Sequence, residues 1–156
     1  MTSTRTTPEA APTQAPAQTW AQPPKRNLRA AAPFKLGRHA IITVGATVAN
    51  ALVFAGGSAA GASMTIDSSA YSQITMPMTI TATLIPLLGA GAATWLIARR
   101  TPRFRTVALW LGLSVALLST ASPFVVAQDT ATTLSLAAMH LVAAIAWSTG
   151  LTNKLH

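Results

Sequence analysis

Cysteine is missing from this 156-residue chain, and acidic residues are nearly so, with three Asp and Glu in total. Without cysteine there is no disulfide, no thiol nucleophile and no thiolate site for zinc or an iron–sulfur cluster, which excludes disulfide-exchange enzymes of the membrane. Charged residues make up only 9% of the chain, whereas soluble proteins average about 25%. Because so little charge cannot cover a water-exposed surface, the composition predicts an integral membrane protein.

The basic residues outnumber the acidic ones and give a net charge of +8. Such an excess can indicate nucleic-acid binding. Here, however, the basic residues stand beside long apolar runs and do not line one face of an amphipathic helix. We therefore expect the lipid bilayer, and no nucleic acid, as the partner of this chain.

Four stretches without acidic residues, Lys or Arg are long enough to cross a bilayer core, which takes about 20 residues in a helix. They cover about residues 39–57, 76–98, 106–123 and 130–151. The predicted fold class is therefore all-α, a four-transmembrane-helix bundle in residues 36–156. Residues 1–35 are rich in Pro, Ala and Thr, which predicts a disordered tail. A docking peptide around Trp20 is the less favoured interpretation of that tail.

The loop between the second and third stretches carries four arginines, Arg99, Arg100, Arg103 and Arg105. Placing arginine at the centre of a bilayer costs about 2.5–3.5 kcal/mol on insertion scales. The loop should therefore stay in the cytoplasm, which predicts a plasma-membrane protein with both termini inside and all eleven Lys and Arg on that side. Binding of anionic lipid headgroups by this cluster is a further, less favoured expectation.

A basic stretch before an apolar run also resembles a secretory signal, with residues 60–62 as a small-residue cleavage site. The basic region would be unusually long and the apolar run is long enough to span, so a retained first helix is favoured. Trp95, Trp110 and Trp147 fall near the cytoplasmic ends of their predicted helices. Indole rings gather at the membrane interface, so this placement agrees with the predicted orientation.

Two residues predict local features of these helices. Pro86 lies inside the second stretch, where its missing N–H should kink the helix and free the carbonyl near Ala82. Asp129 precedes the fourth stretch and can accept from the Thr132 amide as an N-cap. Small residues recur in three of the stretches and favour close helix packing within one bundle over a dimer face: Gly45, Ala49, Gly89, Gly91, Ala93, Ala137 and Ala144.

Two polar side chains, Asn50 and His140, fall deep within predicted spans. Polar groups inside a membrane are costly and often functional, and a histidine can change its charge near neutral pH. His140 could thus carry a proton or bind a ligand. The favoured alternative keeps it neutral and hydrogen-bonded across helices to Asn50, Thr47 or Thr83. Asp129 lies eleven residues before His140, about 16 Å along a helix, which is too far for a direct pair.

Neither a cofactor nor a catalytic site is expected. Haem held by two histidines needs both at one depth, but His39 falls at the edge of the first span and His156 ends the chain. A metal ion would need a second histidine or a carboxylate at the depth of His140. The sequence also contains no serine-nucleophile motif and no glycine-rich phosphate loop.

Three segments resemble an uncharacterised bacterial family of small four-span integral membrane proteins, a domain of unknown function. They are residues 129–142, which contain Asp129 and the Met139–His140 pair, residues 98–102, and residues 48–53 around Asn50. The resemblance covers about residues 36–152. It implies a retained first helix and a candidate cluster of polar residues, but no known activity.

Three classes of function remain open. The favoured one is a non-enzymatic packing or accessory subunit, with a membrane protein partner or a second copy of the chain. The alternative is a small solute or proton transporter that uses the level of Asn50 and His140. An enzyme acting on lipid or quinone ranks last, because His140 is the only candidate acid–base group.

Overall fold

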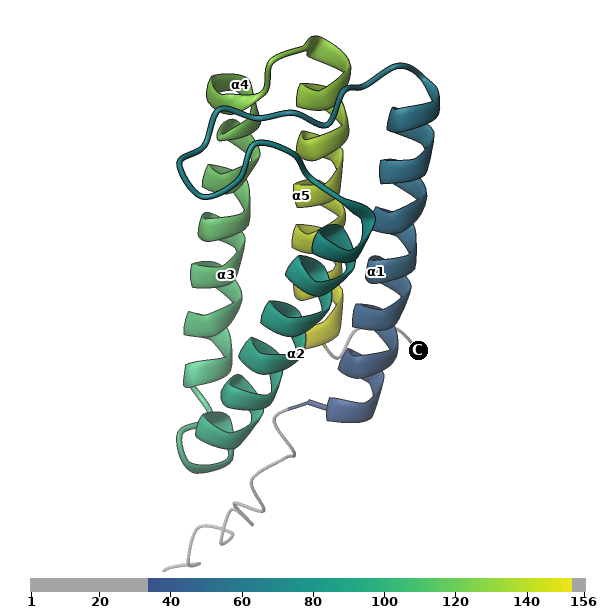
Figure 1. Cartoon of the computed structure of the whole chain (residues 1–156). Coiled ribbons are helices and arrows are strands. Elements are labelled where there is room, and N and C mark those ends of the chain that lie inside the picture. Colours follow the sequence, from purple (N-terminus) through teal and green to yellow (C-terminus); the bar gives the residue numbers. More distant parts are fainter. Residues whose placement is uncertain (1–33, 153–156) are drawn as a thin grey trace, which may run out of the picture.

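The computed structural model describes residues 34–152. Within them the chain forms five helices: α1 (Leu36–Ala59), α2 (Met76–Arg100), α3 (Phe104–Ala121), α4 (Pro123–Val126) and α5 (Thr130–Leu151). The four long helices lie side by side, and the short α4 extends α3 (Figure 1). Four segments are long and apolar enough to cross a membrane: α1, α2, α3 together with α4, and α5. The predicted all-α, four-span bundle is therefore confirmed.

The two ends of the bundle differ. At one end lie the first and last described residues and the connection between α2 and α3, together with six basic residues; we call it the basic end, and its basic residues are Lys35, Arg38, Arg99, Arg100, Arg103 and Arg105. The other end carries residues 60–75 and 122–129, and we call it the capped end (Figure 1). The Arg38 guanidinium donates to the Thr152 carbonyl over 2.8 Å and so joins the start of α1 to the end of α5.

Most of the predicted disordered tail lies outside the described residues. Phe34, which the sequence prediction assigns to that tail, is described and is only 2% exposed. Its ring packs into a core cluster at the basic end with Ala108, Trp147 and Leu151. The bundle therefore takes a core residue from the segment before α1.

The helices turn polar and small side chains inward and many large apolar ones outward. The buried polar residues are His39, Thr43, Thr47, Asn50, Thr79, Thr83, Thr94 and Thr132. Large apolar residues such as Ile41, Leu118 and Val125 are mostly exposed. This distribution suits a lipid surround, because hydrocarbon solvates leucine and valine as well as a protein interior does, whereas polar groups need partners inside the bundle.

The connection between α1 and α2 folds across the capped end (Figure 1). An antiparallel bridge joins Ile66 to Ala127, and the Asp67 amide donates to the Val126 carbonyl over 2.8 Å. The loop after α1 is thus paired with the segment after α4. This bond gives a partner to the Val126 carbonyl at the end of α4 and to the Asp67 amide of the loop, which would otherwise lack one.

Asp129 is the N-cap residue of α5 and the centre of the capped end. Its Oδ1 accepts from the Thr132 amide over 2.7 Å, and its Oδ2 accepts from the hydroxyls of Ser63 (2.6 Å) and Thr132 (2.7 Å). The hydrogen bond from the Ser63 hydroxyl, followed by those from Thr132, holds the pKa of this carboxyl well below its usual range. The same cluster holds Met64 in a left-handed conformation at φ 54°, since the Met64 amide donates to the Thr132 hydroxyl over 2.9 Å.

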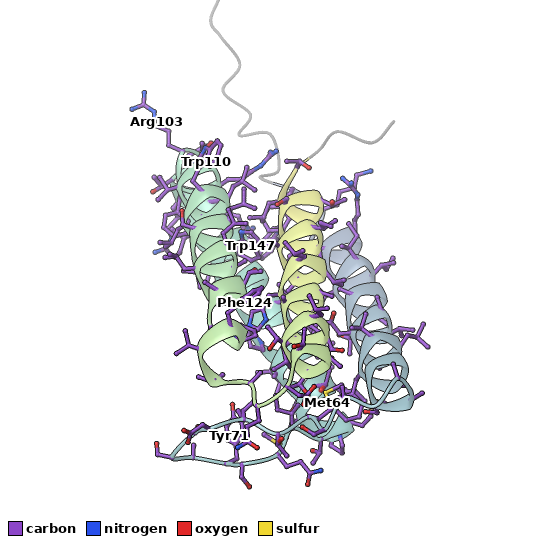
Figure 2. The ribbon with its side chains drawn as sticks, turned by 90° about the horizontal axis from the view of Figure 1, so that it is seen from above. Met64, Tyr71, Arg103, Trp110, Phe124 and Trp147 are labelled. Atoms are coloured by element: carbon purple, nitrogen blue, oxygen red, sulfur yellow. The ribbon has the colours of Figure 1, made fainter. Side chains whose placement is uncertain are left out.

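The tryptophans do not form one belt. Trp110 is 63% exposed, whereas Trp147 is buried and its indole N–H donates to the Ala108 carbonyl over 3.1 Å. Figure 2 shows Trp147 within the bundle and Trp110 nearer Arg103 at the basic end. The prediction of an interface position is therefore wrong for Trp147. Helical spacing turns its ring toward α3, where Gly112 leaves room for it.

Candidate functional site

A cavity of about 400 Å³ lies between α2, α3 and α5. Its walls are mainly apolar, with Asn50 of α1 contributing from the fourth long helix and Tyr71 from the loop at the capped end. Ligand sites in proteins typically have volumes of about 300–1,000 Å³, apolar walls and a few polar groups. The cavity has this character, and it contains both polar residues that the sequence placed deep in the spans.

Part of the cavity wall is exposed. Four of the wall residues are exposed: Ala82 and Pro86 of α2, Val115 of α3 and Tyr71 of the loop at the capped end. Figure 1 shows α2 and α3 meeting at the basic end and diverging toward the capped end. Both helices belong to segments long and apolar enough to cross a membrane, so in a bilayer their exposed wall residues would lie at the level of the hydrocarbon.

His140 lies half-buried in the cavity wall and bonds within its own helix. Its Nδ1 is 2.7 Å from the Leu136 carbonyl oxygen. A carbonyl can only accept, so Nδ1 carries the proton and Nε2 of the neutral ring is an acceptor. The predicted bond from His140 across helices to Asn50, Thr47 or Thr83 is therefore wrong. A backbone carbonyl one turn earlier is within reach of the ring and replaces it.

The bond across helices is made by Asn50. Its Nδ2 donates to Thr83 Oγ1 over 2.9 Å, linking α1 to α2. Thr83 donates its own proton to the Thr79 carbonyl over 2.8 Å, so its oxygen must accept here and the orientation of the Asn50 amide is fixed. Asn50 is 3% exposed, and its Oδ1 is buried with no hydrogen-bond partner among the described residues.

Pro86 also faces the cavity, together with the residue one turn before it. The α2 helix runs without interruption through Pro86. Since proline has no N–H, the Ala82 carbonyl lacks its usual donor four residues on. Ala82 and Pro86 both line the cavity, so the residue whose carbonyl the sequence predicts to be freed lies in its wall. The predicted kink at Pro86 stays a prediction.

The chain can be placed in a family. The sequence pattern of a family of unknown function, DUF6069, matches residues 30–156. The chain belongs to the DUF6069 family. No curated protein and no solved structure matches it. The resemblance to a family of unknown function is thus confirmed, and the match begins a few residues earlier than expected from the sequence.

A second histidine site in this DUF6069 protein was missed by the sequence analysis. His39 was placed at the edge of a span, but it is 0% exposed. Its Nε2 donates to the Leu87 carbonyl over 3.0 Å, and its ring meets Phe34 and Trp147 edge-on with centroids 5.8 Å apart. Gly91 and Gly150 border the ring so closely that a Cβ at either would clash with it. Gly91 and Gly150, which leave room for a large side chain between their helices, were the sequence features that could have indicated the burial of His39.

His39 and His140, the histidines within the described part of the DUF6069 protein, are far apart. His39 packs against Gly150, ten residues after His140 on α5, which corresponds to about 15 Å along the helix. They cannot hold one haem iron between them. Among residues 34–152, no three His, Asp or Glu side chains lie together as metal ligands would.

The arginine cluster of the DUF6069 protein lies apart from the cavity. Arg99 and Arg100 end α2, while Arg103 and Arg105 flank the start of α3 at the basic end. The Arg99 guanidinium lies 4.6 Å from the centre of the Trp95 ring, a cation–π distance. Figure 2 shows Arg103 projecting from the tip of the bundle. These side chains form a charged rim, and none of them lines the cavity.

Proposed function

We propose that this protein is a non-enzymatic membrane protein that binds a small, largely apolar molecule in the cavity between α2, α3 and α5. The observation that carries the proposal is the cavity itself, with mainly apolar walls and exposed wall residues on two candidate spanning helices. A bundle needed only for packing gains nothing from such a space, because each unfilled volume forfeits dispersion contacts. The accessory role favoured by the sequence is compatible with this proposal, as a subunit that holds the molecule for a partner.

We also propose that the basic end faces the cytoplasm in the plasma membrane. Arginines flank the α2–α3 connection, and Lys35 and Arg38 stand at the start of α1. The described connections at the capped end carry Asp67 and Asp129 and no Lys or Arg. The positive-inside rule supports this orientation, and anionic headgroups would then meet the charged rim.

Transport is the second candidate, because His140, Asn50 and Pro86 all line one cavity. A transport path would have to continue to the basic end. There Phe34, His39 and Trp147 fill the interior, each less than 9% exposed. Passage would require this aromatic cluster to open, so binding is favoured over transport.

Photolabelling tests the proposed binding. A decane carrying a mid-chain diazirine is added to the full-length protein in lipid nanodiscs, and labelled residues are located by mass spectrometry. We expect saturable labelling of cavity residues such as Met139 and Leu136. Ala116→Trp should fill the cavity from α3 and abolish this labelling, whereas Leu118→Trp, on the exposed side of α3, should leave it unchanged. Equal labelling of Met139 in both variants would contradict the proposal.

Proton flux in liposomes tests the second candidate. Wild-type protein and His140→Ala are reconstituted at equal density, and dye-reported flux is followed under a pH gradient. Flux that falls in His140→Ala would favour transport. Equal flux in both, at the level of empty liposomes, would remove it.

A further inference from the structure

We infer, on the basis of the proposed binding function, that the molecule in the cavity carries a neutral hydroxyl group, as an alcohol or phenol does, and that this hydroxyl donates to Nε2 of His140. The inference identifies the ligand class from the hydrogen-bonding state of the wall. One polar group of the wall, Nε2 of His140, is an acceptor that no donor of the described residues satisfies.

Several donors of the wall are already used inside the protein. His140 Nδ1–H donates to Leu136, Thr79 donates to the Thr75 carbonyl over 3.1 Å, and Thr83 donates to the Thr79 carbonyl over 2.8 Å. One of the two Nδ2 protons of Asn50 donates to Thr83. The protons in these bonds are therefore not available to a ligand.

Acceptors without a donor remain at the wall. Nε2 of neutral His140 has a lone pair and no partner among the described residues. Oδ1 of Asn50 is also without a partner but is itself buried, and the Ala82 carbonyl lacks the amide that Pro86 cannot supply. The hydroxyls of Ser119 and Tyr71 also border the cavity and can serve either role. A bound molecule that donates a hydrogen bond would therefore satisfy Nε2 of His140.

The charge of the wall argues for a neutral donor. No Asp, Glu, Lys or Arg is among the residues that line the cavity. An ammonium group would lose its hydration without gaining a counter-ion, and a carboxylate or phosphate would meet acceptors with no cation beside them. A hydroxyl avoids both costs, since it carries no charge and brings the missing proton.

The exposed part of the wall favours the bilayer as the source. Ala82, Pro86 and Val115 line the cavity, are exposed and belong to helices apolar enough to span a membrane. A molecule with a long apolar part and one hydroxyl concentrates in a bilayer and reaches these residues without crossing water. The apolar part would occupy the walls, and the hydroxyl would lie at the level of His140.

Paired probes test this inference in nanodiscs that contain the full chain. The first is decanol with a mid-chain diazirine, and the second is its methyl ether with the same diazirine, which cannot donate. In the wild type we expect half-maximal labelling of Met139 at a mole fraction about three- to twentyfold lower for the alcohol, the range of one hydrogen bond within a membrane. In His140→Leu, half-maximal labelling of Met139 should require the same mole fraction of the alcohol as of the ether.

A matched control and a second measurement separate this effect from a change in folding. Ser148→Ala removes a similar bond within α5, from Ser148 Oγ to the Ala144 carbonyl, away from the cavity, and should leave the preference for the alcohol unchanged. Nitrogen-15 NMR of labelled histidine should show the Nε2 signal of His140 shifting with decanol and not with the ether.

The outcomes are distinguishable. If alcohol and ether label Met139 equally and the Nε2 signal does not shift, the donor inference is overturned while the binding function stands. If neither probe labels the cavity, both are overturned. If a five-carbon diazirine alcohol labels Met139 at a lower membrane mole fraction than the decanol probe, the long apolar part of the inferred ligand is overturned.

Discussion

The basic end and the cavity region of the bundle use the same four long helices and differ in how they are filled. At the basic end, Phe34, His39 and Trp147 plug the interior, and Gly91 and Gly150 let the helices close around the imidazole. Toward the capped end, α2 and α3 diverge (Figure 1), and no Phe or Trp is among the residues that line the cavity there.

This difference shows where a helical membrane protein obtains its rigidity and where it keeps space. In lipid, helices associate through close packing and hydrogen bonds, because burying apolar surface gains little. The basic end has both, with aromatic rings in glycine-lined spaces and N–H groups donating to carbonyls of neighbouring helices. The cavity region is tied by one such bond, from Asn50 to Thr83, and otherwise holds open volume.

Truncating Trp147, one of the aromatic residues that fill the interior at the basic end, should have the largest effect on stability. Trp147→Ala deletes a buried ring and the bond to the Ala108 carbonyl. We expect a loss of about 3–5 kcal/mol in the free energy of unfolding, as for other buried aromatic truncations. Denaturant titration in mixed micelles measures it. Trp110→Ala, on the exposed surface, should change stability little, and an equal loss in both variants would contradict a plugged basic end.

Crowding the space around His39 should have the next largest effect. Gly150→Ala places a Cβ against the imidazole, and overpacking of this kind costs about 1–3 kcal/mol. Gly89→Ala is the matched control in α2, because nothing lies within 4 Å of a Cβ added there. In the same unfolding assay the control should be neutral or stabilising. A neutral Gly150→Ala would show that the basic end is not tightly packed.

Breaking the hydrogen bond between α1 and α2 beside the cavity should cost less. Thr83→Val leaves the Asn50 amide without its acceptor, and we expect a loss of about 0.6–1.7 kcal/mol in the free energy of unfolding. Asn50→Leu should cost less than Thr83→Val, because it also removes an Oδ1 that has no partner. The reverse order in the same assay would contradict the described bonding of Asn50.

The smallest effect concerns the capped end and its dependence on pH. Because the pKa of Asp129 is lowered by bonds that exist only in the folded chain, the carboxylate stabilises the fold fully above its ordinary pKa of about 3.9 and progressively less as the pH falls below that value. Carbon-13 NMR of the carboxyl should give a midpoint below 3.9. Ser63→Ala should raise that midpoint, while Ser68→Ala, in the same loop, should not. Equal Asp129 midpoints in the wild type and in Ser63→Ala would show that Ser63 does not bond Asp129.

The fold could be predicted from the sequence because each span is encoded by residues close together in the chain. Uncharged stretches of sufficient length mark the helices, and an aspartate directly before the last one marks its start. The charged loop separates α2 from α3 in the same way. These signals depend on residues close together in the chain and on the energetics of a bilayer, so they needed no knowledge of packing.

The candidate site could be predicted only in part. Asn50 and His140 were found because polar residues stand out in apolar runs, and both line the cavity. The hydrogen bonds of Asn50 and His140 were not predicted. A histidine such as His140 can reach a backbone carbonyl one turn earlier in its own helix as easily as a side chain on another helix. His39 was missed because distance from the end of a span says little about burial when Phe34, before the helix, folds over it. The cavity itself depends on how far α2 and α3 diverge, which no local pattern encodes.

The bridge between Ile66 and Ala127 has a consequence for the order in which the chain assembles. Ile66 lies in the connection between α1 and α2, and Ala127 lies in the connection between α4 and α5. The Ser63 amide and hydroxyl can donate to Asp129 only when these two connections lie side by side. The contacts across the capped end therefore form only after the two helix pairs have come together.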